Sequence, residues 1–355
     1  MAVEPDPFHA SEWRGARLTA RVAEARARGL ARRAGALADL RLDDDSRLTD
    51  RIRFEVTSRL RTLAETVARD LSRQAERLAP DGAPLNLPPP AELVDRLRET
   101  GALAEPELVT ELVAQARQAL LAESLPIDPV AGDARSLLVR LAEAPDRIVV
   151  AAARHVLAAE GRARVAGLED EAVGLPTDLY HRLVWTVAAA LRQGGGAGQD
   201  GILAQAAERV LAAQDVGDRL EAAALRLAAA IDARATELPD LLIECLSDRQ
   251  LSVFIALLAH AAGIEPDVVR DLVLEPEGDR LWLALRAIDL DRPTIARIGI
   301  SLCEADRRRD EDGFADALDA IMAVPPADAR LAIASLTLPR PFRDAVERLE
   351  GFARR

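Results

Sequence analysis

The sequence predicts an all-α protein, on three observations. Apolar residues recur every three or four positions through most of the chain, which is the period of an amphipathic helix. Proline or glycine interrupts these runs every 15 to 30 residues or so, as at helix ends. No strand-type alternation of apolar and polar residues lies between the runs. We therefore expect an irregular HEAT-like array of antiparallel helix pairs, preceded by a long-helix hairpin at the N-terminus.

The composition favours closely packed helices with an acidic surface. Hydrophobic residues make up 49% of the chain and aromatic residues only 3%, so the core must consist mainly of leucine, valine, isoleucine and alanine. The formal net charge is −13, and all 46 cationic side chains are arginine. Such a chain lacks the basic face that general nucleic-acid binding needs, which argues against nucleic acid as a partner. The composition fits a cytoplasmic location.

The cysteines and the N-terminus point to the same compartment. Cys245 and Cys303 both lie in apolar helical patterns, so we expect buried free thiols in a reducing environment. The first residues are acidic and lack an apolar run, which predicts no signal peptide. No stretch approaches the roughly 18 uncharged apolar residues of a membrane span, so we expect none.

The sharpest charge asymmetry lies in residues 1–38. Seven arginines against four acidic residues give this segment a charge of +3, which leaves −16 for the rest of the chain. One interpretation is a basic helix, carrying Arg14, Arg17 and Arg21, that binds an acidic partner, an anionic lipid surface or nucleic acid. The other is a solvated helix that pairs with the acidic body of the same protein.

Residues 48–78 predict one long amphipathic helix. Their apolar positions are spaced mostly by four, which forms a single stripe over about nine turns. This helix either packs against the preceding segment as a hairpin or forms a homodimer. Prolines between positions 80 and 90 predict a linker, and we therefore set a first domain, a hairpin or arm, at residues 1–85.

A recurrent helix-start signal organises the remaining chain. Pro145, Pro239 and Pro266 are each followed by aspartate and then by an apolar-periodic run, and proline suits the first helical position. Helices joined by short turns pack as antiparallel neighbours, at about 40 residues per pair in HEAT-like solenoids. The glycine-rich run at 194–198 predicts a flexible loop. We expect a helical subdomain at 86–193 and a helical-repeat subdomain at 194–355.

The usual catalytic and metal-binding patterns do not occur in this sequence. It contains no His-Glu-x-x-His, Cys-x-x-Cys or Gly-x-Ser-x-Gly motif, and we predict no catalytic residue, no cofactor and no metal. The best candidate surface is a helix face with Asp178, His181 and Trp185, at spacings of three and four. Its plainer interpretation is a surface Asp–His pair with the tryptophan in the core. The run 307–309, three arginines between aspartates, predicts a self-neutralised loop, with an anion site as the alternative.

Three stretches together look familiar. They are residues 175–192, which include Tyr-His-Arg-Leu-Val-Trp, residues 254–264, Phe-Ile-Ala-Leu-Leu-Ala-His-Ala-Ala-Gly-Ile, and residues 273–288, which include Glu-Pro-Glu-Gly-Asp-Arg-Leu-Trp. They resemble an uncharacterised alphaproteobacterial family, a domain of unknown function that is HEAT-like in appearance. The resemblance covers about residues 130–345. It implies an all-helical fold and brings neither a reaction nor functional residues.

These observations predict a non-catalytic protein-interaction or regulatory scaffold that binds a protein partner in grooves between stacked helices. Two alternatives stay open. One is a helical-repeat binder of nucleic acid or anionic surfaces that uses the N-terminal arginine helix. The other is an all-helical enzyme that uses His181 and carboxylates, which would require a concave pocket around them.

Overall fold

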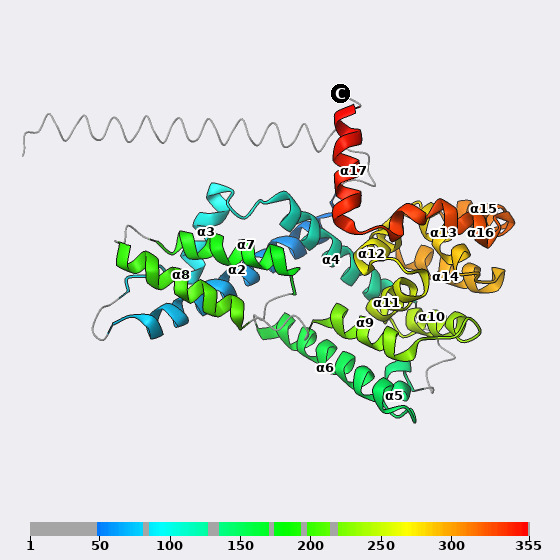
Figure 1. The fold of residues 1–355 in the computed structure, drawn as a ribbon, viewed down its shortest axis with the longest axis horizontal. Helices are drawn as coiled ribbons and strands as arrows, with labels where there is room; N and C mark the ends of the chain where they lie inside the picture. The colour runs from blue at the N-terminus through cyan, green and yellow to red at the C-terminus, as the bar shows by residue number, and fades with distance from the viewer. Residues whose placement is uncertain are drawn as a thin grey trace, which may run out of the picture. The chain divides into compact units, whose positions relative to one another are not determined.

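The computed structural model describes residues 48–80, 85–126, 135–169, 174–192, 197–213 and 219–353 (Figure 1). These residues contain sixteen α-helices, one short 3-10 helix and no strand. The predicted all-α fold is confirmed. The first part of the expected N-terminal hairpin, residues 1–47, lies outside the described residues.

The long amphipathic helix predicted at 48–78 is α2 (Asp50–Leu78). Its apolar stripe is buried, and Leu63, Val67 and Leu71 are fully enclosed. The stripe is therefore covered within the chain, and a homodimer through it would require α2 to leave its neighbours. Four helices pack against α2: α3 (Pro90–Thr100), α4 (Pro106–Ser124), α7 (Thr177–Ala190) and α8 (Ala197–Ala212).

The other helices form a second group around one large apolar core. In this group α6 (Arg147–Glu169) packs on α9 (Leu220–Ile231), and α9 packs on α11 (Leu251–Ala262). The remaining members are α5 (Leu137–Leu141), α10 (Leu238–Ser247), α12 (Pro266–Leu274), α13 (Asp279–Ala287), α14 (Arg292–Ala305), α15 (Glu311–Ala323) and α16 (Pro326–Ala332). The chain then continues through η4 (Ala334–Thr337) to α17 (Arg340–Ala353).

Helix starts follow the predicted signals. Pro266 is the first residue of α12, and Pro239 is the second residue of α10. Asp146 lies just before α6, where its Oδ1 accepts the backbone N–H of Ile148 at 2.7 Å. Each signal removes or satisfies a backbone donor that a helix N-terminus would otherwise leave unpaired. Short local sequence patterns are therefore enough to place these helices.

The chain passes back and forth between the two groups. Helices α5 and α6 belong to the second group, α7 and α8 return to α2, and α9 joins the second group again. Helix α4 packs on α12 and α14 and so connects the groups. The domain boundaries at 85/86 and 193/194 stay predictions, and the contacts of α2 with α7 and α8 run across them.

Candidate functional site

The predicted face of α7 is exposed to solvent. His181 is exposed, and Trp185 is 43% exposed, so the interpretation that places this tryptophan in the core is wrong. The Oδ2 of Asp178 lies 3.8 Å from Nη2 of Arg182, and among the described residues Asp178 forms no ion pair with His181. The three predicted residues share one helix face but do not form a hydrogen-bonded group.

Arg182 forms the ion pairs on this surface. Its Nη1 lies 3.0 Å from Oε1 of Glu105, and its Nη2 donates to the carboxylate of Glu107. Glu105 immediately precedes α4 and Glu107 lies in its first turn, so these ion pairs tie α7 to the start of α4. Ion pairs this open to solvent contribute little to stability. This face of α7 exposes an aromatic ring and an imidazole group to solvent. The ion pairs of Arg182 hold α7 only weakly against α4.

The other predicted interaction residues are not part of the described structure. Arg14, Arg17 and Arg21 fall within residues 1–47 and so lie outside the described residues. The basic N-terminal helix therefore stays a prediction from the sequence.

The most deeply buried ion pair of the described residues joins α4 to α12. Glu111 accepts two parallel hydrogen bonds from Arg270, Nη1 to Oε1 at 2.8 Å and Nη2 to Oε2 at 2.7 Å. Their side chains are only 12% and 10% exposed. Burial alone would raise the pKa of Glu111, but the hydrogen bonds and positive charge of Arg270 outweigh burial and lower that pKa. The pair fixes the junction of the two helix groups.

Gln115 extends this junction to the start of α7. Its Nε2 donates to Oε1 of Glu111 at 2.8 Å and to the backbone oxygen of Gly174 at 3.0 Å. Arg219, just before α9, donates to the backbone oxygen of Leu175 at 2.5 Å. A Cβ added at position 174 would lie 2.6 Å from Cδ of Arg219, so a larger residue there would displace that side chain.

Two further carboxylates approach the Glu111–Arg270 pair. Desolvation by surrounding protein atoms raises the pKa of both Glu221 and Asp271, although both residues are exposed to solvent. The cluster therefore holds one carboxylate whose pKa is lowered and two whose pKa values are raised. Its hydrogen bonds join α4 to α12 and to the backbone of Gly174, which gives it a clear structural role.

The sequence interpretation missed Glu111 and Arg270. They lie 159 residues apart and belong to no recognised motif. One signal was available: Arg270 sits among Val269 and Val273 on the apolar side of its helix, where a charged residue needs a buried partner. The identity of that partner follows only from the fold.

The C-terminal helix presents an apolar surface to solvent. Phe342, Val346 and Leu349 are 56%, 37% and 70% exposed, and their spacings of four and three place them on one side of α17. We call these three residues the α17 face. Figure 1 shows α17 extending away from the other helices from its N-terminal end.

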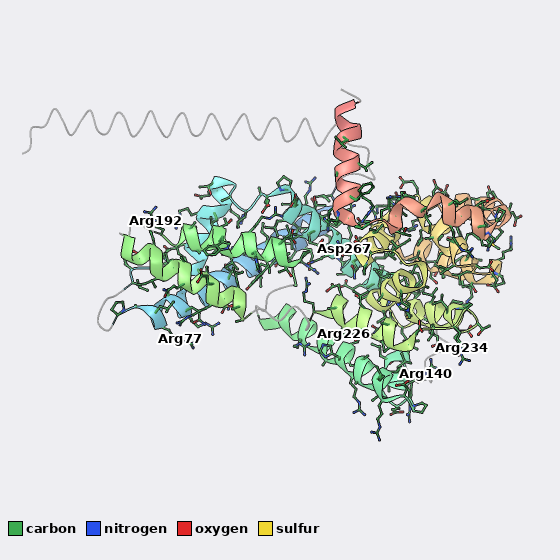
Figure 2. All side chains as sticks on the ribbon, viewed as in Figure 1. Arg77, Arg140, Arg192, Arg226, Arg234 and Asp267 are labelled. Atoms are coloured by element: carbon green, nitrogen blue, oxygen red, sulfur yellow. The ribbon has the colours of Figure 1, made fainter. Side chains whose placement is uncertain are left out.

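Charged contacts hold the start of α17 to α12. Glu265 accepts the backbone N–H of Arg340 at 3.3 Å through Oε1, and its Oε2 lies 3.1 Å from Nη2 of Arg343. Nη1 of Arg340 also lies 3.5 Å from Oδ2 of Asp267, which is labelled in Figure 2 near the first turn of α17. These contacts use polar groups of the first turn and leave the α17 face open.

The cysteines are buried free thiols, as predicted, and burial raises the pKa of both Cys245 and Cys303. Within the described ranges, no group of three or more His, Cys, Asp and Glu residues is arranged to hold a metal ion. In the same part of the chain, no single helix has the length and apolar character to cross a membrane. Helices α11 and α12 meet those criteria only as a pair bent by 118°.

Comparison with known proteins places the chain in a family. The family described as "Uncharacterised protein conserved in bacteria (DUF2336)" matches residues 151–334, from within α6 to the first residue of η4. No curated protein and no solved structure matches the chain. The family match spans 184 of the 355 residues and lies inside the region of the sequence resemblance, whereas α2–α5 and α17 lie outside it. The chain belongs to this DUF2336 family of uncharacterised bacterial proteins.

Proposed function

We propose that this protein is a non-catalytic interaction protein that docks α17 into an apolar groove of a protein partner. One observation carries the proposal: the α17 face is an exposed apolar stripe on an already formed helix. Helices that bind in grooves present anchors at positions i, i+4 and i+7, which is the spacing of Phe342, Val346 and Leu349. Burial of that stripe would supply the binding free energy.

The energetics favour docking of this helix. Full burial of an exposed Phe or Leu side chain contributes roughly 1.5–3 kcal/mol. Covering the α17 face would therefore contribute several kcal/mol to the free energy of binding. Glu265 already fixes the first turn of α17. A preformed helix loses less conformational entropy on binding than a disordered segment does.

The charges of the C-terminal segment indicate what rims the groove. Residues 340–355 carry five arginines and three acidic residues, but Arg340 and Arg343 already lie against Asp267 and Glu265 at the start of α12. The other three arginines and the three acidic residues balance, so a rim that carries both charges would complement this segment. The proposed partner is therefore a protein with an apolar groove bordered by residues of both charges.

We propose that α6–α16 serve as an irregular HEAT-like scaffold that carries α17. The successive packing of α6 on α9, α9 on α11 and α11 on α12 supports this part of the proposal. We also propose that the protein is cytoplasmic. Its two cysteines are free thiols, which is typical of a reducing compartment. The two alternative functions gain no comparable support, because His181 forms no ion pair with a described residue and the N-terminal arginines lie outside the described residues.

Replacing Phe342 with aspartate should weaken partner binding and leave the fold intact, because Phe342 is 56% exposed. The matched control is Ile148→Asp on α6, where the replaced side chain is 71% exposed. Affinity capture with the wild type and both variants identifies proteins lost only with Phe342→Asp. The purified partner should then bind Phe342→Asp at least about tenfold more weakly than it binds the wild type or the control.

Thermal unfolding of the three proteins should coincide, which separates loss of binding from loss of fold. Equal binding of the purified partner by Phe342→Asp and the wild type would contradict the proposal. Sedimentation that shows a wild-type dimer lost in Phe342→Asp would assign the α17 face to a second copy. Flotation with lipid vesicles that is lost in the same variant would assign the face to a membrane.

A further inference from the structure

Helix α17 receives little support from neighbouring helices. It has 14 residues, a length at which an isolated helix is only marginally stable in water. The described helices make no extended contact with α17, which projects from them at its N-terminal end (Figure 1). Its first turn contains Arg340 and Arg343 and no acidic residue, so these two charges oppose the helix dipole. The contacts at this end are therefore the ones on which the helix depends.

Glu265 supplies the negative charge that the first turn of α17 lacks. Its Oε1 accepts the backbone N–H of Arg340 at 3.3 Å, and its Oε2 accepts from Nη2 of Arg343 at 3.1 Å. Nε of Arg343 also donates to the backbone oxygen of Leu338 at 3.0 Å, which fixes this side chain beside Glu265. A carboxylate that accepts a backbone donor of the first turn does what a capping residue does, here from another helix.

The same residue begins α12 through its backbone alone. The backbone oxygen of Glu265 accepts the N–H groups of Val268 and Val269 at 3.0 and 3.1 Å, whereas its side chain forms no capping hydrogen bond to α12. Glu265 thus serves two helices through separate groups, its carbonyl for α12 and its carboxylate for α17. Replacing the side chain therefore keeps the start of α12 and removes only the contact with α17.

We propose that the Glu265 carboxylate caps α17 from α12 and so determines whether residues 340–353 are helical. Exposed ion pairs contribute little to a whole protein, but a helix that is marginal by itself responds to small contributions in its first turn. Because helix formation is cooperative, loss of the cap frays the segment beyond that turn. With the cap, the α17 face is an ordered apolar stripe; without it, the same three residues lie on an unfolded segment.

The test is amide hydrogen exchange of the full chain without a partner, measured by rapid mixing and mass spectrometry. In Glu265→Ala, exchange within α17 should quicken by about three- to thirtyfold, the size expected for loss of a cap. The matched control is Glu275→Gln at the other end of α12, which loses the ion pair with Arg280 at 3.0 Å. It should leave exchange in α17 unchanged.

A second variant separates capping from simple attachment to α12. Pro339 immediately precedes α17, and its backbone oxygen accepts the N–H groups of Phe342 and Arg343 at 3.0 and 3.2 Å, as at an N-cap position. Pro339→Asp gives the helix a cap of its own. Combined with Glu265→Ala, it should restore slow exchange in α17 although the contact with α12 stays broken.

Equal exchange within α17 in Glu265→Ala and the wild type would overturn the proposed cap. So would faster exchange that Pro339→Asp does not reverse, or exchange that quickens equally throughout the chain. One consequence rests on the proposed function: Glu265→Ala should bind the partner more weakly although the α17 face is intact. If exchange changes as expected and partner binding does not, the cap stands and the docking of α17 is contradicted.

Discussion

Replacing Glu111 with glutamine should lower the free energy of unfolding by about 3 kcal/mol or more, because it leaves the buried guanidinium of Arg270 without its counter-charge. The two side chains are 12% and 10% exposed and share two parallel hydrogen bonds. Chemical denaturation of the wild type and Glu111→Gln at neutral pH measures the difference. The matched control is Glu123→Gln, which removes the exposed ion pair with Arg51 and should cost well under 1 kcal/mol.

The effect should depend on pH in a defined direction. The pKa of Glu111 is lowered in the folded protein from its ordinary value of 4.5, so the unfolded chain binds the proton more tightly. The stabilisation is therefore fully present above the unfolded pKa and disappears as pH falls through the folded pKa. The stability difference between wild type and Glu111→Gln should be constant from about pH 6 upward and shrink below pH 4 or so. A difference that grew in acid would contradict this assignment.

Removing both charges should cost far less than removing one. In a Glu111→Leu, Arg270→Met double variant, the buried charge and its partner disappear together, and stability should return to within about 1–2 kcal/mol of the wild type. A double variant as unstable as Glu111→Gln would show that the hydrogen bonds of Gln115 and Gly174 around the pair, and not the pair itself, carry the effect.

Replacing Gly299 with alanine should destabilise the protein by about 2–3 kcal/mol, because the added methyl group enters space occupied by the ring of Phe314. Gly299 lies in α14 and Phe314 in α15, and Phe314 also packs on Trp282 with ring centroids 4.7 Å apart. The aromatic ring therefore cannot move away freely. The midpoint of thermal unfolding reports the loss.

Gly161→Ala is the matched control for this substitution. Gly161 lies in α6, and a Cβ there would meet nothing within 4 Å. Alanine is favoured over glycine in helices by roughly 0.8–1.0 kcal/mol, so Gly161→Ala should stabilise the protein. If Gly299→Ala lowers the stability and Gly161→Ala raises it, the loss at Gly299 is due to packing against Phe314. A neutral Gly299→Ala would show that α14 and α15 separate easily.

Local sequence patterns predicted the parts of the fold that depend on local physics. The apolar stripe of residues 48–78 is α2, and the Pro-Asp pairs lie at helix starts, because amphipathic periodicity and capping act within a few residues. The return of α8 to α2 could not be predicted. It depends on which apolar stripes fit each other over more than 100 residues of chain.

The candidate sites also combine features that local sequence predicts with features that depend on tertiary packing. The shared face of Asp178, His181 and Trp185 followed from helical spacing, but the exposure of Trp185 depends on what α7 packs against. The Glu111–Arg270 pair joins distant segments and carries no spacing signal. The exposure of α17 likewise follows from the position of the helix, since its apolar pattern alone would equally predict a buried face.

The most direct test of the proposed function is photo-crosslinking at Leu349 in the cells that make the protein. A photoreactive amino acid replaces Leu349 in the α17 face, and the same amino acid replaces exposed Ile148 in a parallel protein. The proposal predicts a discrete covalent adduct with another protein from position 349 that does not form from position 148. No adduct at 349, or the same adducts from both positions, would contradict the proposal that α17 docks into a protein partner.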